Sequence, residues 1–235
     1  MVNIDTVYQR VLALANKEQR GYITPQEFNL FANQAQMDIF EQYFYDINQF
    51  GRVPGNNTGS SDMLDYLEEK VSVFEQDKSI NINSTQEFYN IGASTSDLYK
   101  IDNVVYNDSY SCEQTNSNQL QNILDSPLLK PTSYNPIYTL KRNNKLFLYP
   151  THLKEKIVVN YIRKPKKAVW SYTVVGNSAL VNIGANDYQD FELHPSEETK
   201  LVVKILALAG VTLKDPALYQ IATAEDNKNI QQEKQ

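Results

Sequence analysis

Acidic side chains near residue 190 come closest, by type and spacing, to catalytic machinery in this sequence. The five carboxylates are Asp187, Asp190, Glu192, Glu197 and Glu198. Two nearby carboxylates can serve as general acid and general base when their surroundings separate their pKa values. Glu197 and Glu198 instead follow Pro195 at the expected start of a helix, where the helix dipole stabilises negative charge. We therefore interpret the cluster as structural and expect the protein not to be an enzyme.

The histidines and the single cysteine show no spacing that indicates a metal site or a nucleophile. His152 and His194 lie far apart in the chain and do not form the i, i+4 pair that puts two ligands on one helix face. Cys112 is expected in a polar loop without a surrounding motif, which is typical of an inert thiol. The sequence contains no nucleophile elbow, dinucleotide fingerprint or Walker pattern. No metal and no cofactor are predicted.

The basic run Arg163, Lys164, Lys166 and Lys167 is the only segment whose charge favours contact with nucleic acid. Three interpretations stay open: a solvated strand edge, a DNA contact, or a docking site for an acidic neighbouring subunit. The whole chain has 22 Lys and Arg against 28 Asp and Glu, a net charge of -6. That balance argues against a dedicated nucleic-acid clamp, which needs a basic face to neutralise phosphates.

Composition indicates a folded protein of one large or two small domains. The chain has 235 residues, of which 41% are hydrophobic and 21% charged, and this excludes a mostly disordered polypeptide. The single cysteine and the absence of a secretory signal predict synthesis in a reducing cytoplasm. The longest apolar run, near 201–211, falls far short of the roughly 20 residues that cross a bilayer, so no membrane partner is expected.

Helices are predicted at the start of the chain. Apolar spacing of three and four residues predicts a helix over 5–17. Thr24 as N-cap, Pro25 at the first helical position and Glu27 closing a capping box predict the start of a second. Its apolar stripe comprises Phe28, Phe31, Ala32, Ala35, Ile39, Tyr43 and Ile47, widened by Phe40 and Phe44. The stripe fits either the core face of a helical hairpin or a subunit contact, for which Phe28, Phe31, Phe40 and Phe44 are the candidates.

The middle of the chain changes from helical spacing to alternation, which predicts strands. After a polar loop over 50–61 and a short helix over 62–69, alternation begins at 71–76. Further strands are expected at 98–106, 137–140, 146–149, 157–162, 169–175 and 179–181, with a short helix at 119–125. Asn143 and Asn144 predict a tight hairpin, because asparagine tolerates the left-handed backbone of such turns.

The C-terminal part returns to helix. A helix opening at Pro195 or Ser196 is apolar nearly all round, so we expect it to be buried and to end at Gly210. A last helix is expected from Asp215 and Pro216. From Glu225 onward the chain is polar with Ile230 as its one apolar residue. We therefore expect this tail to dock into another protein or to become ordered on assembly, with Ile230 as a candidate contact.

The order of these elements predicts an α+β protein. Residues 1–69 and 185–235 are expected to form a discontinuous helical bundle. Residues 70–184 are expected to form an inserted antiparallel β-sheet or small β-sandwich.

Three stretches resemble a known family of virion proteins. They are residues 16–29 (NKEQRGYITPQEFN), the phrase Tyr161-Ile162-Arg163-Lys164-Pro165, and Phe191-Glu192-Leu193-His194-Pro195-Ser196 with Gly210 and Asp215-Pro216. These segments resemble head-to-tail adaptor proteins of short-tailed bacteriophages that infect Bacteroidetes, including the crAss-like group, where they are called ring proteins. The resemblance covers both ends and part of the middle, and it carries over no functional residue.

The resemblance implies a structural role in the neck of a virion. Such subunits form a ring, usually of twelve copies, beneath the portal protein and above other ring proteins of the tail, and double-stranded DNA passes through the hole without sequence-specific binding. Synthesis is then expected in the cytoplasm of the bacterial host. The alternative from a different class is a tail-associated carbohydrate- or receptor-binding module that uses exposed tyrosines and Trp170 against sugar faces. An enzyme, the third class, has no motif behind it.

Overall fold

The computed structural model describes residues 1–17, 23–50, 62–81, 87–91, 97–141, 144–176 and 178–212. It divides into two compact units. The helical unit contains the described residues of Met1–Val73 and Pro165–Gln235, and the sheet unit is Phe74–Lys164. These divisions fall after residues 73 and 164, whereas the sequence placed them after 69 and 184.

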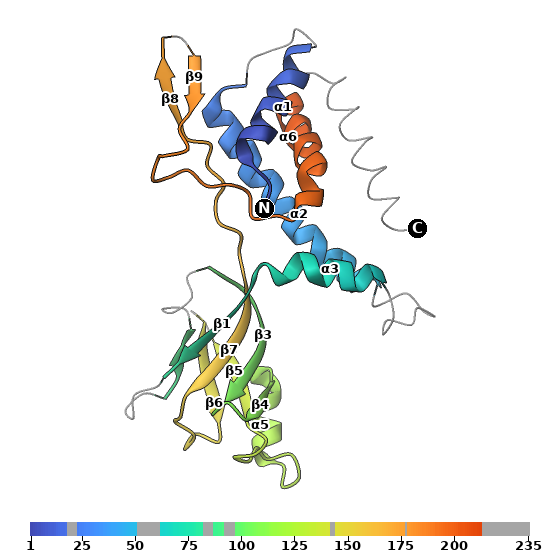
Figure 1. The fold of residues 1–235 in the computed structure, drawn as a ribbon. Coiled ribbons are helices and arrows are strands. Elements are labelled where there is room, and N and C mark those ends of the chain that lie inside the picture. The colour runs from blue at the N-terminus through green and yellow to red at the C-terminus, as the bar shows by residue number, and fades with distance from the viewer. Residues whose placement is uncertain are drawn as a thin grey trace. The chain divides into compact units, whose positions relative to one another are not determined.

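The helical unit is built from α1 (Ile4–Lys17), α2 (Pro25–Phe50), α3 (Asp62–Ser72), the 3-10 turn η2 (Pro195–Glu197) and α6 (Glu198–Thr212). Figure 1 shows α1 and α2 beside α6, although α6 lies near the other end of the sequence. The core side chains between them are buried, among them Ile4, Val7, Phe28, Ile39, Leu201 and Ile205. The predicted burial of the helix after Pro195 is confirmed, but α6 continues past Gly210 to Thr212.

The predicted capping box at the start of α2 is confirmed. The Thr24 backbone N–H donates to Glu27 Oε2 at 3.0 Å, and the Glu27 N–H donates to Thr24 Oγ1 at 3.3 Å. The Thr24 hydroxyl also donates to the same carboxylate at 2.7 Å. These bonds to the charged form lower the pKa of Glu27, with the Thr24 side chain as the largest cause. The local sequence thus determines where α2 begins.

Trp170 joins α1 and α2 to the chain that returns from the sheet unit. Its indole N–H donates to Asp5 Oδ1 at 2.9 Å, and its backbone N–H donates to Asn29 Oδ1 at 2.8 Å. Its ring lies 4.1 Å from the Tyr8 ring and stacks on Tyr172 at 5.7 Å, centroid to centroid. Trp170 is buried. It therefore serves as a core residue of the helical unit.

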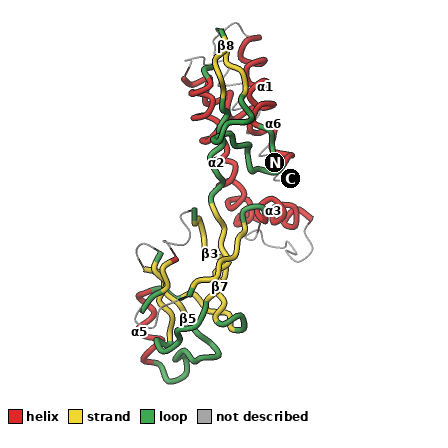
Figure 2. The backbone as a smooth tube through the Cα atoms, turned by 60° about the vertical axis from the view of Figure 1, so that its left-hand side comes forward, coloured by secondary structure: helices red, strands yellow, loops and turns green. Residues whose placement is uncertain are grey.

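The sheet unit contains seven strands that form one curled sheet. The strands are β1 (Glu75–Ile80), β2 (Tyr89–Asn90), β3 (Leu98–Tyr106), β4 (Tyr110–Gln114), β5 (Ile137–Lys141), β6 (Lys145–Tyr149) and β7 (Ile157–Arg163). Their order is β1-β7-β3-β4-β5-β6-β2. The pairs are antiparallel except β4 with β5, whose parallel connection contains α5 (Ser117–Asp125). Figure 2 shows these strands in yellow.

Irregular pairing in β3 accompanies the curl of the sheet. The register between β3 and β7 shifts between Leu98 and Lys100 and again between Ile101 and Asn103, so Tyr99 and Asp102 are extra residues on β3. Such bulges bend a strand and increase its twist. The inner face carries the core, which includes Tyr89, Val104, Leu146, Ile157 and Val159.

The predicted architecture of a helical bundle with a small inserted sheet or sandwich is wrong, although the protein is broadly α+β. The sheet has seven strands and is a main part of the fold. The sequence did not predict β2, which has two residues, or β4, which buries only Cys112. It placed β1 too early in the chain, because β1 buries only Ile80 and shows no alternation of buried and exposed residues. Residues 71–76 were expected to begin the strands, but Val71 and Ser72 end α3 and the strand begins at Glu75.

Other predicted elements are confirmed with small changes in their bounds. β3 has the predicted range, while β5, β6 and β7 each gain one residue and α5 begins two residues earlier. The two strands expected at 169–175 and 179–181 are β8 (Tyr172–Val175) and β9 (Ser178–Val181), which lie in the helical unit. Asn144 has the expected positive φ of 52°. The loop after Phe50, Asn143, and the chain from residue 213, for which a last helix and a docking tail with Ile230 were predicted, lie outside the described residues.

Candidate interaction surfaces

The predicted contact residues on α2 are divided between the core and the surface. Phe28 and Phe40 are completely buried in the helical unit, which leaves no ring surface for a partner. Phe31 and Phe44 are half-buried, and the Phe44 ring packs edge-on against Phe40 at 5.0 Å. At Phe28 and Phe40, the apolar stripe of α2 therefore faces the core of the helical unit. Of the four candidates, Phe31 and Phe44 retain partly exposed rings.

The basic run also separates into different environments. The Arg163 side chain is buried, lies 5.8 Å from the Phe74 ring centroid and donates from Nη1 to the Lys164 carbonyl at 3.2 Å. Arg163 is therefore a structural cation of the sheet unit and not part of an exposed patch. Lys164, Lys166 and Lys167 are exposed. Lys164 ends the sheet unit, whereas Lys166 and Lys167 belong to the helical unit.

The acidic cluster near residue 190 contributes to folding through separate partners. Asp190 Oδ1 accepts from the Ile4 N–H at 2.8 Å, and Glu192 Oε2 accepts from the Lys166 N–H at 2.8 Å. Glu197 pairs with Lys70 and Glu198 with Arg10, while Asp187 accepts from the Ser171 hydroxyl. Because each carboxylate bonds a different residue, the five groups do not form a paired acid and base.

Asp190 also accepts a hydrogen bond from Tyr188. The Tyr188 hydroxyl donates to Asp190 Oδ1 at 3.0 Å. Burial, followed by that hydrogen bond and the Asp190 charge, raises the pKa of Tyr188 to about 12. Tyr188 is therefore a neutral hydrogen-bond donor at neutral pH.

The histidines and the cysteine occupy structural positions. His194 Nδ1 accepts from the Ser196 N–H at 3.3 Å and caps η2. His152 is exposed beside Ser133. Cys112 lies in β4, not in a loop as expected, and burial raises its pKa to about 11. A thiol with that pKa is a poor nucleophile at neutral pH.

The described ranges contain neither a metal-binding cluster nor a membrane-spanning helix. No group of three or more His, Cys, Asp or Glu side chains there has the arrangement of a metal site. Across the same residues, no helix combines the length and apolar character that a bilayer crossing requires.

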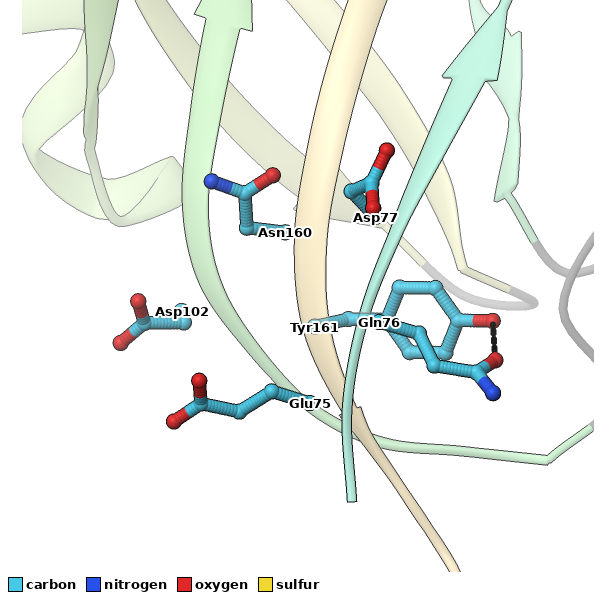
Figure 3. A pocket seen from close by; sticks show the side chains of 6 residues that line it. All are labelled: Glu75, Gln76, Asp77, Asp102, Asn160 and Tyr161. Atoms are coloured by element: carbon cyan, nitrogen blue, oxygen red, sulfur yellow. Dashed lines mark hydrogen bonds between the residues drawn. The ribbon is translucent and has the colours of Figure 1, made fainter. Parts of the chain in front are cut away.

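A shallow acidic hollow lies on the β1, β7 and β3 strands of the sheet unit. Figure 3 shows its lining: Glu75, Gln76, Asp77, Asp102, Asn160 and Tyr161. The volume of the hollow is about 270 Å³. Register places Asp77 opposite Asn160, and the β3 bulge adds Asp102. The Tyr161 hydroxyl donates to Gln76 Oε1 at 3.1 Å. Three carboxylates make the hollow repel phosphate and attract cations.

The β8–β9 hairpin presents apolar side chains to solvent. These side chains, which we call the hairpin surface, are Val175 and Leu180 on one face of the hairpin, Val174 on the other face, and Ile183 just after β9. Val174 is 63% exposed and Ile183 69%. No charged residue occurs between Lys167 and Asp187. In the part of the chain that the structure describes, β8 and β9 pair only with each other.

A second apolar surface lies on the sheet unit, just after α5. This helix–loop surface consists of Leu128, Leu129 and Tyr134. Leu128 is 95% exposed and Tyr134 75%. α5 itself buries none of its residues. Between Glu113 and Lys141 the only charged residues are Asp125 and Lys130.

Sequence reasoning missed the acidic hollow and both apolar surfaces. The hollow combines three strands that are far apart in the chain, so no local spacing marks it. The apolar surfaces contain residues that a sequence assigns equally well to a core. The uncharged stretch between Lys167 and Asp187 was the one available signal, because exposed strands normally carry protective charges.

Comparison with known proteins found no matching family model and no matching curated protein.

Proposed function

We propose that this chain is a structural protein of a short-tailed bacteriophage and forms a ring in the head-to-tail connector beneath the portal. The observation that carries this proposal is the exposure of apolar side chains on two separate surfaces, one in each unit. Apolar patches of this kind on a soluble protein mark places where another macromolecule binds. The resemblance to ring proteins supplies the kind of assembly.

A ring makes a specific demand on its subunits. Each copy must contact two neighbours through two different surfaces, because a contact between identical surfaces closes as a dimer. The hairpin surface and the helix–loop surface differ in residues and in unit, which meets that demand. The half-buried Phe31 and Phe44 and the tail with Ile230 add contacts for copies, for the portal protein or for other ring proteins.

The charges support a conduit for double-stranded DNA that does not grip it. Every copy contributes a net charge of -6, and the acidic hollow shows that carboxylates gather on one strand surface. Carboxylates facing a channel repel phosphate, so DNA can slide. Lys164, Lys166 and Lys167 are exposed, and we assign them to contact with an acidic neighbouring subunit.

The competing functions have less support. A carbohydrate-binding module would need an exposed aromatic platform. Trp170 cannot supply it because it is buried and bonded to Asp5, which leaves exposed tyrosines such as Tyr134. An enzyme would need converging groups, but the carboxylates near residue 190 each have a structural partner.

Mass measurement of the assembled species tests the proposal. Native mass spectrometry of the purified chain and cryo-EM of particles should show a closed ring, expected to hold twelve copies. A chain that is monomeric both in solution and in the virion would contradict the proposal. A glycan-binding screen of the same preparation separates the ring from the carbohydrate-binding module, for which Tyr134→Ala would abolish any signal.

A further inference from the structure

The hairpin surface lies on two exposed strands that lack protective charges. Natural sheets protect exposed edges with charges, and the outer strand β1 follows this rule with Glu75, Asp77 and Lys78 among its six residues. β8 and β9 carry no charge at all and expose Val174, Val175 and Leu180. An isolated two-stranded hairpin is only marginally stable by itself. The contrast within one chain indicates that the hairpin is covered in the assembled state.

Backbone hydrogen bonds within the loop order the helix–loop surface. The Lys130 N–H donates to the Ser126 carbonyl at 3.2 Å, and Thr132 and Asn135 exchange two backbone hydrogen bonds. The Tyr134 ring packs edge-on against Tyr110 at 5.6 Å. A loop ordered before binding loses little conformational entropy when a partner covers it. The backbone that carries Leu128 and Leu129 is therefore ordered before a partner binds.

The two surfaces match each other chemically. Both are apolar, and neither brings a cluster of charges that would have to lose its water on contact. The acidic hollow and the exposed lysines would have to give up solvation if an apolar hairpin covered them. The helix–loop surface is thus the better partner for the hairpin on another copy.

We propose that the hairpin surface of one copy packs on the helix–loop surface of the next copy. This inference rests on the proposed ring and names the contact that builds it. The contact joins two different surfaces, so it repeats from copy to copy and can close as a ring. Pairing of two hairpins would instead end at a dimer.

Site-directed disulfide formation tests this contact. Val175→Cys and Leu128→Cys chains, given tags of different mass, are mixed, assembled and oxidised; Leu180→Cys with Tyr134→Cys forms a second pair. We expect disulfide-linked heterodimers from at least one pair. The Val175→Cys/Leu128→Cys double variant should give a ladder of covalent oligomers. The native Cys112 is buried and does not take part.

The controls separate the inference from the proposed ring. Ser79→Cys on the exposed β1 edge, mixed with Val175→Cys, should give no link. Disulfide-linked homodimers of Val175→Cys as the main product would overturn the inference. A ring detected by native mass spectrometry, but without a disulfide in either cysteine pair, would also overturn it and would leave the proposed function standing. A chain that never assembles, in particles included, refutes both proposals.

Substitution to aspartate tests the same contact independently, in chains without added cysteines. Leu180→Asp should weaken association of copies at least about tenfold, because it buries a carboxylate in an apolar contact. Ser79→Asp adds the same charge to an exposed strand position outside the contact and should leave association unchanged. Equal effects of the two substitutions would overturn the inference.

Discussion

The ammonium group of Lys70 and the carboxylate of Glu197 form an ion pair in which the side chains are only 7% and 3% exposed. Lys70 belongs to α3 and Glu197 to η2, so the pair fastens α3 to the start of α6. The ammonium also lies 4.3 Å from the Tyr66 ring centroid and 5.5 Å from that of Tyr43. Lys70 and Glu197 are separated by about half of the chain, and only folding brings them together.

Breaking the Lys70–Glu197 pair should be costly, whereas replacing both partners should not. Glu197→Gln leaves a buried ammonium without its counter-ion and should lower the free energy of unfolding by about 3 kcal/mol. The double variant Lys70→Met/Glu197→Leu should recover most of that loss. Urea unfolding followed by circular dichroism measures both. Equal losses in the single and double variants would contradict the buried-pair account.

Trp170→Phe should destabilise the helical unit by about 2 to 4 kcal/mol, because it removes the donor to Asp5 and leaves unfilled volume beside Tyr8. Tyr172→Phe is the matched control, since within the described ranges the Tyr172 hydroxyl accepts one long bond, from Gln26 at 3.5 Å. Thermal unfolding by circular dichroism compares them. A control that loses as much as Trp170→Phe would show that the Asp5 bond has no special role.

The Cys112 thiol should be unreactive in the folded protein. Its pKa of about 11, against a usual 9.0, lowers the thiolate fraction about a hundredfold near neutral pH, and burial blocks access as well. Reaction with a thiol-specific disulfide reagent should therefore be slow until urea unfolds the sheet unit. Ser111→Cys, exposed on the same strand, should react at once. Fast labelling of native Cys112 would refute its burial in β4.

Alkaline pH should destabilise the sheet unit. Burial raises the pKa values of Tyr89, Tyr106, Tyr138 and Tyr161 above their usual 10.0. A raised pKa means that folding favours the neutral phenol, so this stabilisation is complete below about pH 10 and is lost as pH rises through the folded values. Urea midpoints should fall above about pH 10. Tyr138→Phe should make the fall shallower, and unchanged midpoints would contradict the prediction.

Removal of the residues after Ala224 should spare folding and impair attachment to the neck. The removed segment is polar except for Ile230 and has little apolar surface to contribute to a core. Circular dichroism and urea unfolding should match the full chain, while incorporation into particles should drop. Incorporation at the full-length level would remove the tail from the list of contacts.

Local chemistry accounts for the features that were predicted well. Thr24, Pro25 and Glu27 define the start of α2 through bonds within four residues, and alternation in 98–106 defines β3. These features need no distant partner, so spacing and residue type are enough. The same applies to Asn144, whose side chain tolerates the positive φ that its turn requires.

Long-range packing accounts for the features that could not be predicted. β4 is polar and mostly exposed, so its place beside β3 depends on the turn at Asn107 and Asp108, with φ of 48° and 51°, and on pairing with the distant β5. The sequence predicts an exposed charge at Arg163, but its side chain is buried beside the Phe74 ring. The burial of a side chain depends on what folds over it.

The amino-acid sequence by itself determined the helical ends, the strand-rich middle, the helix caps and the lack of any motif for catalysis, because each is a property of neighbouring residues. Tertiary structure decided which apolar residues form the core and which stay exposed. Phe28 and Val175 are equally apolar in the sequence, yet packing against α1 and α6 buries one and the end of a hairpin exposes the other. Hydrophobicity drives burial without specifying a partner, and only the fold supplies the partner.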